Sequence, residues 1–430
     1  MAHALTLKNI KRQIRKSLPL PVVRRIYRTQ AARYIADLKA DYDPAQKTIL
    51  AINHLFDQDL NALALANSKY NFIILDFAIM FRAGKTYFSK PVHLITAPYD
   101  SEPERNRMLY REECRLYFEK LTDRFHPDLI LVPNDNFAFI REFIHVAHEN
   151  GVPTVILDKE GTISPNSFEA EAERARKFTP FISDHVFVWS ERQKAYWRNR
   201  DVSPDCITVV GQPRSDLFYS QQTDRVSGLF PGQKPLITLF SYFDDAYIPL
   251  TLKKTEGLSW KAMKTESHDF LSELAKKNPD FNFVIKCHPQ QLDIDYLAKR
   301  YNHNNLRVLG GADIANELIQ KSELIIAFQT TSVIEAMFMN KKIIYTAWDP
   351  NYERLKDDIL PFHTASGIVI ADTREKFHQV CDRFFSGNHS DFSFSEDQLE
   401  ARDKFVNEYF YKPDGHVCER FFEEIGRFLS

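Results

Sequence analysis

Glycine is scarce in this chain, and the enzyme signatures that depend on glycine are missing. Only 13 glycines occur among 430 residues, so no glycine-rich linker is expected. The sequence contains no P-loop, no G-x-G-x-x-G turn and no G-x-S-x-G nucleophile elbow. These absences argue against P-loop kinases, against dehydrogenases with the dinucleotide fingerprint and against α/β-hydrolases.

Cysteine is sparse too, and long apolar runs are lacking. The five cysteines lie at positions 114, 206, 287, 381 and 418, without a C-x-x-C pair. An odd number of widely spaced cysteines is typical of reduced thiols rather than of a disulfide framework or a zinc site. No apolar run approaches the ~18 residues that span a bilayer, and the N-terminus lacks the apolar core of a signal peptide. We therefore expect a cytoplasmic protein.

Positive charge is concentrated near the N-terminus. The formal net charge of -2 argues against a general nucleic-acid binder. Residues 1–40, however, carry ten Lys or Arg against Asp37 alone. Leu5, Leu7, Ile10 and Ile14 follow one helical face, Pro19 and Pro21 end that helix, and Val22–Leu38 begins a second amphipathic stretch. Such helices suit an anionic inner-membrane surface; alternatively, this arm packs on the protein. In the first case a chain beginning near Asp41 should still fold.

The chain is too long for a single core, because such cores stop growing near ~250–300 residues. Short apolar runs alternate with helical patterns, as in parallel sheets with helical crossovers. The first series of expected strands is Thr48–Ile52, Phe72–Leu75, His93–Thr96, Leu129–Val132, Thr154–Leu157 and Val186–Trp189. The second series is Leu236–Phe240, Phe283–Lys286, Arg307–Leu309, Leu324–Ala327, Ile343–Thr346 and Ile368–Ala371.

Four segments follow from these two series. They are a basic helical segment (1–43), an N-terminal Rossmann-like acceptor domain (44–222), a C-terminal Rossmann-like donor domain (233–390) and C-terminal helices (391–430) that pack back across the junction. Two doubly wound α/β domains are expected to face a central cleft. Ligands of such sheets bind at the carboxyl ends of the strands, so chemistry is sought directly after each strand.

The expected strand Phe283–Lys286 ends in a Lys-x-His-Pro sequence. At the two-residue period of a strand, Lys286 and His288 point to the same side. Pro289 interrupts the strand and leaves the imidazole at the sheet edge. The pair suits a phosphate leaving group, which a cation holds and a histidine can protonate near neutral pH. Alternatively, His288 is a strand-end histidine bonded to a carbonyl.

A polar turn follows the expected strand Leu324–Ala327. It contains Gln329, Thr330, Thr331 and Ser332. The helix that opens here presents N–H groups that favour an anion, and the hydroxyls add donors. Ser332 and Glu335 also fit an ordinary capping box. Together with the Lys-x-His-Pro strand end, this turn makes the second half the expected nucleotide-binding domain.

Carboxylates follow two further strands. Glu160 lies in the Asp-Lys-Glu-Gly loop after Thr154–Leu157, where it can act as base toward an acceptor hydroxyl. Asp244 and Asp245 follow Leu236–Phe240 and are expected to face the first half across the cleft. Either set alternatively belongs to a solvated loop.

A Gly-x-Pro-Arg-x-Asp sequence ends the first half. It is interpreted as a structural corner near the hinge, in which Arg214 pairs with Asp216. The D-x-D triplets 57–59 and 41–43 match a metal-binding pattern, but such triplets arise by chance among 58 acidic residues.

In order and spacing, these motifs resemble those of bacterial glycosyltransferases that use CMP-activated acidic sugars. The acidic loop at 158–161, the corner at 211–216, the His-Pro pair and the hydroxyl turn fall within roughly residues 125–350. They look most similar to the retaining β-Kdo transferases of capsule and O-antigen synthesis, and more distantly to bacterial sialyltransferases. Lys159 departs from the sialyltransferase pattern, which has a second acidic residue there.

The resemblance implies a GT-B-like fold and a set of roles. His288 and the Thr330–Ser332 turn would bind the CMP phosphate, Glu160 would be the acid/base residue, and Asp244 or Asp245 the nucleophile of a double displacement. The reaction would transfer Kdo from CMP-Kdo to a glycan or lipid-linked glycan, with no metal and no further cofactor. Competing possibilities are sialyl transfer, CDP-glycerol-type polyol-phosphate transfer, a UDP-sugar GT-B enzyme, and a non-catalytic nucleotide-binding scaffold in an assembly complex.

Overall fold

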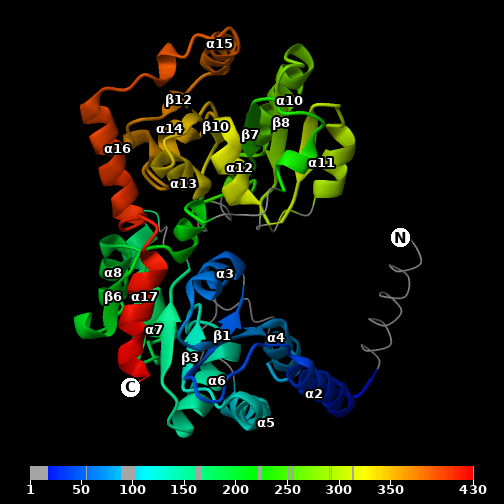
Figure 1. Ribbon diagram of the computed structural model, residues 1–430, viewed down its shortest axis with the longest axis vertical. Helices are drawn as coiled ribbons and strands as arrows, with labels where there is room; N and C mark the ends of the chain where they lie inside the picture. Colours follow the sequence, from blue (N-terminus) through cyan, green and yellow to red (C-terminus); the bar gives the residue numbers. More distant parts are fainter. Residues whose placement is uncertain are drawn as a thin grey trace.

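Two six-stranded parallel sheets, one above the other in Figure 1, form the frame of the molecule. The computed structural model describes residues 18–54, 56–88, 103–159, 164, 167–220, 225–249, 252, 256–289, 291, 293–311 and 314–429. The strand orders are β2-β1-β3-β4-β5-β6 and β12-β11-β10-β7-β8-β9, with parallel pairing throughout. The predicted architecture of two doubly wound α/β domains is confirmed.

The N-terminal sheet is covered by helices on both faces. Its strands are β1 (Thr48–Asn53), β2 (Asn71–Asp76), β3 (Leu129–Val132), β4 (Thr154–Leu157), β5 (His185–Val188) and β6 (Ile207–Val209). Its helices are α3 (Asp57–Ala66), α4 (Ala78–Gly84), α5 (Glu104–Phe125), α6 (Ala138–Glu149), α7 (Phe168–Phe178) and α8 (Glu191–Arg198). Because side chains alternate along a strand, Ile130 packs toward α5 and α6, whereas Leu131 packs on the opposite face with α3.

The C-terminal sheet has the same plan. Its strands are β7 (Leu236–Phe240), β8 (Asn282–Lys286), β9 (Leu306–Leu309), β10 (Ser322–Ala327), β11 (Lys342–Thr346) and β12 (Val369–Ala371). Its helices are α10 (Lys261–Lys277), α11 (Ile294–Arg300), α12 (Ala315–Lys321), α13 (Ser332–Phe338), α14 (Tyr352–Leu355) and α15 (Arg374–Phe385). Strands β7 and β8 are buried along their whole length, which explains their continuous apolar sequences.

The predicted strands agree with the observed ones to within two residues, with two exceptions. The interval His93–Thr96 lies outside the described residues. Strand β6 was missed, because its three residues at the edge of the sheet include the polar Thr208 and give no apolar run. Gly151 follows the end of α6, and its φ of 70° is the left-handed conformation that glycine adopts without strain.

Helix α2 (Leu20–Asp37) is part of the N-terminal domain. Val23, Ala31 and Ile35 are buried, and the helix packs on α4 and α5. The Arg28 guanidinium lies 2.6 Å from the Glu113 carboxylate of α5. This packing argues against the expectation that a chain beginning near Asp41 still folds, and the boundary drawn at residue 43 separates a helix from its own core. Every helix within the described ranges is too short or too polar to span a bilayer.

The C-terminal helices return to the first domain, as predicted. Helix α16 (Glu396–Tyr409) packs on α13 of the C-terminal domain and also reaches α8, and α17 (Val417–Ile425) packs on α3 in the N-terminal domain. The red helices at the left of Figure 1 follow this crossing. The chain therefore passes between the domains twice.

Candidate nucleotide-sugar site

A cavity of about 640 Å³ lies between the two domains. In the C-terminal sheet, β7 lies between β8 and β10. The connection from β7 runs to β8 on one side, whereas that from β10 runs to β11 on the other, which creates a crevice at the carboxyl end of β7. In the N-terminal sheet, β1 has the same position between β2 and β3. The cavity is lined by residues that follow β1, β7, β8 and β10, so both crevices open into one space.

The Lys-x-His-Pro strand end forms part of the C-terminal wall. Lys286 is 3% exposed, and its Nζ donates to the Cys287 carbonyl at 2.8 Å. The His288 ring lies against Phe243, with 4.3 Å between ring centroids, and its backbone N–H donates to Gln291. Lys286, His288 and the exposed Pro289 all line the cavity. Burial raises the pKa of the intervening Cys287 thiol to about 11, so this thiol stays protonated at neutral pH.

The turn after β10 brings its hydroxyls to the same wall. Thr330, Thr331 and Ser332 line the cavity. Gln329 also lines it, but its amide bonds to the fold: Nε2 donates to the Tyr345 hydroxyl at 2.7 Å and to a carbonyl at 2.9 Å, and Oε1 accepts from the backbone of Leu360. These bonds fix the side chain of Gln329, whose own backbone has a φ of 21°, and so stabilise the conformation of the turn.

The capping box expected between Ser332 and Glu335 does not form. Helix α13 begins at Ser332 after Thr331, without a side-chain capping bond. The Glu335 carboxylate instead accepts from Nε of Arg214 at 3.2 Å. Glu335 thus bonds to Arg214 of the N-terminal domain instead of to the start of its own helix.

Arg214 therefore does not pair with Asp216, and that expectation is wrong. Its Nη1 lies 3.3 Å from Oδ2 of Asp59, its backbone N–H donates to the same carboxylate, and its guanidinium stacks over Trp189. Burial raises the pKa of both Asp59 and Glu335, and the positive charge of Arg214 opposes that rise. One cation thus serves two buried carboxylates from opposite domains.

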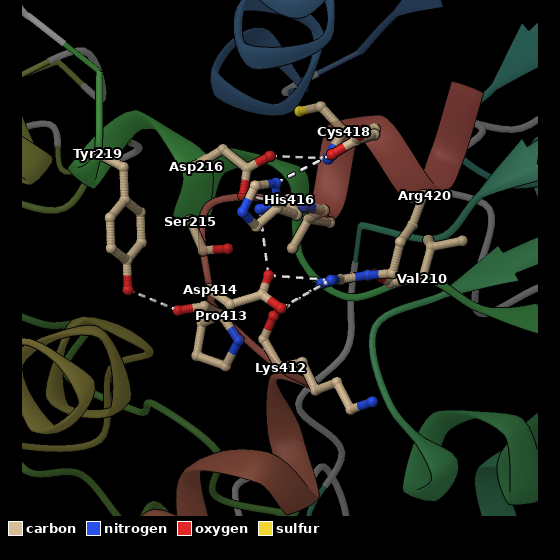
Figure 2. A network of polar contacts seen from close by, with 12 residues as sticks. Val210, Ser215, Asp216, Tyr219, Lys412, Pro413, Asp414, His416, Cys418 and Arg420 are labelled. Carbon is tan, nitrogen blue, oxygen red and sulfur yellow. Dashed lines mark hydrogen bonds and ion pairs between the residues drawn. The ribbon is translucent and has the colours of Figure 1, made fainter. Parts of the chain in front are cut away.

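Asp216 has the structural role that the corner predicted, with different partners. Its carboxylate lies at the start of α17, where it accepts from the backbone N–H groups of Val417 at 3.1 Å and Cys418 at 2.7 Å. Figure 2 shows Asp216 next to Cys418. A cap of this kind fixes the helix that crosses back to the first domain. Gly211 adopts a φ of 102°, and a Cβ there would meet the Tyr411 carbonyl at 2.6 Å, so the corner requires glycine.

None of the expected catalytic carboxylates is among the described residues that line the cavity. Asp244 is ion-paired with Lys264 of α10, and neither Asp244 nor Asp245 is among the described residues that line the cavity, although Phe243 is. Glu160 lies outside the described residues, and Lys159, directly before it, lines the cavity. The acid/base and nucleophile roles therefore stay predictions.

Sequence reasoning missed several cavity residues. Asp59 was dismissed with its D-x-D triplet, and Lys159, Trp189 and Ser241 were given no role, yet all four line the cavity. Each follows a strand of its sheet by a few residues, and position at a strand's carboxyl end was the signal that could have found them. Among the described residues, no cluster of three or more His, Cys, Asp or Glu side chains could hold a metal ion. The metal-free reaction stays a prediction.

Comparison of sequences gives one distant relative. No protein-family model matches the chain. Protein FixF of Sinorhizobium fredii (strain NBRC 101917 / NGR234) is 23% identical over 212 residues, which are 46% of this chain and 50% of FixF. The match thus spans half the length of that relative.

Comparison of structures gives extensive likenesses at low sequence identity. A UDP-N-acetylglucosamine 2-epimerase from Listeria monocytogenes has a TM-score of 0.52 at 12% identity, over 88% of this chain and 96% of that one. The S. aureus MnaA–UDP co-structure has a TM-score of 0.50 at 14% identity, over 89% and 97%. The wall teichoic acid polymerase TagF, an H444N variant with CDPG, has a TM-score of 0.52 at 11% identity, over 99% and 96%. The chain thus has the GT-B fold of two Rossmann-like domains facing a cleft.

Proposed function

We propose that this chain is a glycosyltransferase of bacterial surface-polysaccharide synthesis that transfers Kdo from CMP-Kdo to a glycan or lipid-linked glycan. The observation that carries the proposal is the cavity between the domains. It joins the crevices of two doubly wound sheets, so a donor held by one sheet meets an acceptor held by the other.

The C-terminal wall suits a phosphate leaving group. Lys286 and His288 bring positive charge or acidic protons, and the hydroxyls of Thr330, Thr331 and Ser332 add hydrogen-bond donors. Such donors stabilise the negative charge that develops on a departing CMP. His288 can also deliver a proton to it.

The opposite wall suits an acidic sugar. Lys159 lines the cavity from the N-terminal side, whereas the charge of Arg214 is already shared by Asp59 and Glu335. In Kdo and sialic acid the anomeric carbon carries a carboxylate, and a cation on the acceptor side can pair with it while the phosphate lies on the donor side. The sugar of a UDP-linked neutral hexose carries no carboxylate, so it has no group that would pair with a second cation.

The proposed mechanism is a double displacement with retention, in which Asp244 or Asp245 attacks the anomeric carbon and Glu160 then activates the acceptor hydroxyl. By analogy with retaining glycosidases, the two carboxyl groups should approach to ~5–5.5 Å. Because neither aspartate is among the described residues that line the cavity, this mechanism requires the turn at 243–247 to rearrange when donor binds.

A second candidate is CDP-glycerol-type polyol-phosphate transfer. It is favoured by the likeness to TagF, which covers 99% of this chain. Sialyl transfer, a reaction with a UDP-sugar and a non-catalytic role as a nucleotide-binding scaffold are further candidates, and each predicts a different response to nucleotides and donors.

The deciding experiment has two arms. The first measures thermal stabilisation by CMP, CDP and UDP. The second supplies CMP-Kdo generated in situ, CMP-sialic acid and CDP-glycerol, and identifies the product by NMR. Stabilisation by UDP without CMP contradicts the Kdo proposal, whereas nucleotide binding without turnover of any donor favours the scaffold.

Attachment to the anionic cytoplasmic face of the inner membrane completes the proposal. On α2, Leu20 and Val22 are 57% and 43% exposed, and Arg25 and Arg33 are exposed on the same helix. Each basic residue near such a surface contributes about 1 kcal/mol. This would bring a lipid-linked acceptor to the cleft.

A further inference from the structure

Ser241 lies at the centre of the C-terminal crevice. It is the first residue after β7, the strand from which the connections of the sheet diverge. Its backbone N–H donates to the Lys286 carbonyl at 2.9 Å, so it sits beside the end of β8. The residue is 4% exposed and lines the cavity together with Lys286 and His288. A small hydroxyl is therefore built into the wall that the proposed donor phosphate would contact.

A buried histidine stands directly behind this hydroxyl. Nε2 of His268, on α10, lies 3.0 Å from Oγ of Ser241, and the residue is 1% exposed. The Tyr301 ring packs edge-on against the imidazole, at 5.9 Å between centroids. Lys264 lies one helical turn earlier and is ion-paired with Asp244. Helix α10 thus contacts two residues of the segment after β7, Ser241 through His268 and Asp244 through Lys264. Of these two, Ser241 lines the cavity.

His268 is uncharged at neutral pH. Burial and the nearby Lys264 lower its pKa to about 4, although Asp293 and Asp269 oppose this shift. A neutral imidazole carries one N–H and can either donate to or accept from the serine. A hydroxyl has one proton and two lone pairs, so the direction of this bond decides what Ser241 offers to the cavity.

We propose that Ser241 binds an anionic phosphate oxygen of the nucleotide, and that His268 is a positioning residue whose Nε2–H donates to Oγ and leaves the serine proton directed at the ligand. The inference rests on the proposed function, because it assumes a nucleotide in this cavity. The direction of the bond follows from the wall itself: Lys286 and His288 line the same surface and favour an anion, which needs a donor rather than an acceptor from Ser241.

Isothermal titration of CMP, CDP and UDP tests this proposal. We expect Ser241→Ala to weaken the nucleotide that binds the wild type most tightly by about ten- to a hundredfold, the range for a hydrogen bond to a charged group. We expect His268→Leu to weaken it as well, but to have no further effect in the Ser241→Ala background, because the histidine acts through the serine.

Ser272 and His303 supply a matched control. They form a second serine–histidine pair at 2.8 Å, with the serine on the same helix α10, and neither residue is among those that line the cavity. Ser272→Ala should leave nucleotide affinity unchanged. Melting temperatures of all variants report folding separately from binding.

A second readout does not depend on any variant. The ¹⁵N spectrum of His268 in the wild-type protein should show a proton on Nε2 at neutral pH. A proton on Nδ1, or unchanged affinity in Ser241→Ala, overturns the inference and leaves the proposed function standing. Absence of binding by all three nucleotides to the wild type overturns both.

Discussion

Nε of Arg214, at the end of the N-terminal domain, lies 3.2 Å from Oε1 of Glu335 on the C-terminal helix α13. The same guanidinium contacts Asp59 of α3 at 3.3 Å. Asp59 and Glu335 are 1% and 4% exposed, so two carboxylates from different domains share one cation away from solvent. This arrangement joins the walls of the cavity at one side.

Replacing Arg214 by methionine should destabilise the protein strongly. Removal of one partner from a buried ion pair typically lowers the free energy of unfolding by about 3–5 kcal/mol, because the remaining carboxylates lose the positive charge that offsets their burial. Equilibrium denaturation measures this loss. Adding Asp59→Asn and Glu335→Gln to the same chain should recover much of it, and a triple variant no more stable than Arg214→Met alone would contradict the ion-pair explanation.

The two carboxylates also give a pH dependence with a defined sign. Burial raises the pKa of Asp59 and Glu335 above their values in the unfolded chain, so the folded state retains protons that the unfolded state has lost. Their contribution to stability therefore grows as the pH falls toward the unfolded pKa values, and is lost as the pH rises through the folded ones. Above the unfolded pKa values of about 4, the wild type should lose stability with rising pH relative to an Asp59→Asn, Glu335→Gln variant. The opposite trend would contradict the assignment.

His288→Ala should weaken nucleotide binding and activity without unfolding the chain. The ring lines the cavity beside Phe243, and its loss removes a donor to phosphate. Calorimetric titration with CMP measures the effect. The matched control is His389→Ala, because His389 is exposed and stacks on Phe384 outside the cavity lining. If His288→Ala binds CMP as tightly as the wild type, the phosphate site lies elsewhere.

Replacement of the nucleophile should abolish turnover and spare CMP binding. We expect one of the two variants Asp244→Asn and Asp245→Asn to lose turnover while it still binds CMP. The stereochemistry of the wild-type product is read by NMR. A sugar adduct trapped on the aspartate would support double displacement. Full activity in both variants would move the nucleophile to another residue and favour an inverting reaction.

Two N-terminal truncations should behave differently. Removal of residues 1–17 should leave a folded protein with weakened binding to anionic liposomes at low salt, because it deletes five basic residues. Removal of residues 1–40 should lower the melting temperature sharply, because it strips Val23, Ala31 and Ile35 from the N-terminal core and leaves Glu113 without Arg28. Equal liposome binding with and without residues 1–17 would limit any membrane contact to α2 or exclude it.

The sequence predicted the fold better than the site. Buried parallel strands such as β3 are apolar on both faces, and that property is local, so each one can be found without its neighbours. The interactions of Asp59 and Glu335 depend on Arg214, which is 155 and 121 residues away from them. Local patterns therefore suggested a chance triplet for Asp59 and a capping box for Glu335. Only the packing of two domains identifies them as one buried cluster.

The double passage of the chain between the domains limits how the cleft can open. One passage leaves the corner near Tyr219, and the other runs through Pro413 between α16 and α17. The Tyr219 hydroxyl donates to the Pro413 carbonyl at 2.8 Å, so the two passages are tied together, as Figure 2 shows. A single tether would let one domain swivel freely, whereas two joined tethers leave mainly a rotation about the axis that they define. Under the proposed function, each closure would return the two walls to the same register, so that donor and acceptor would meet in the same relative orientation.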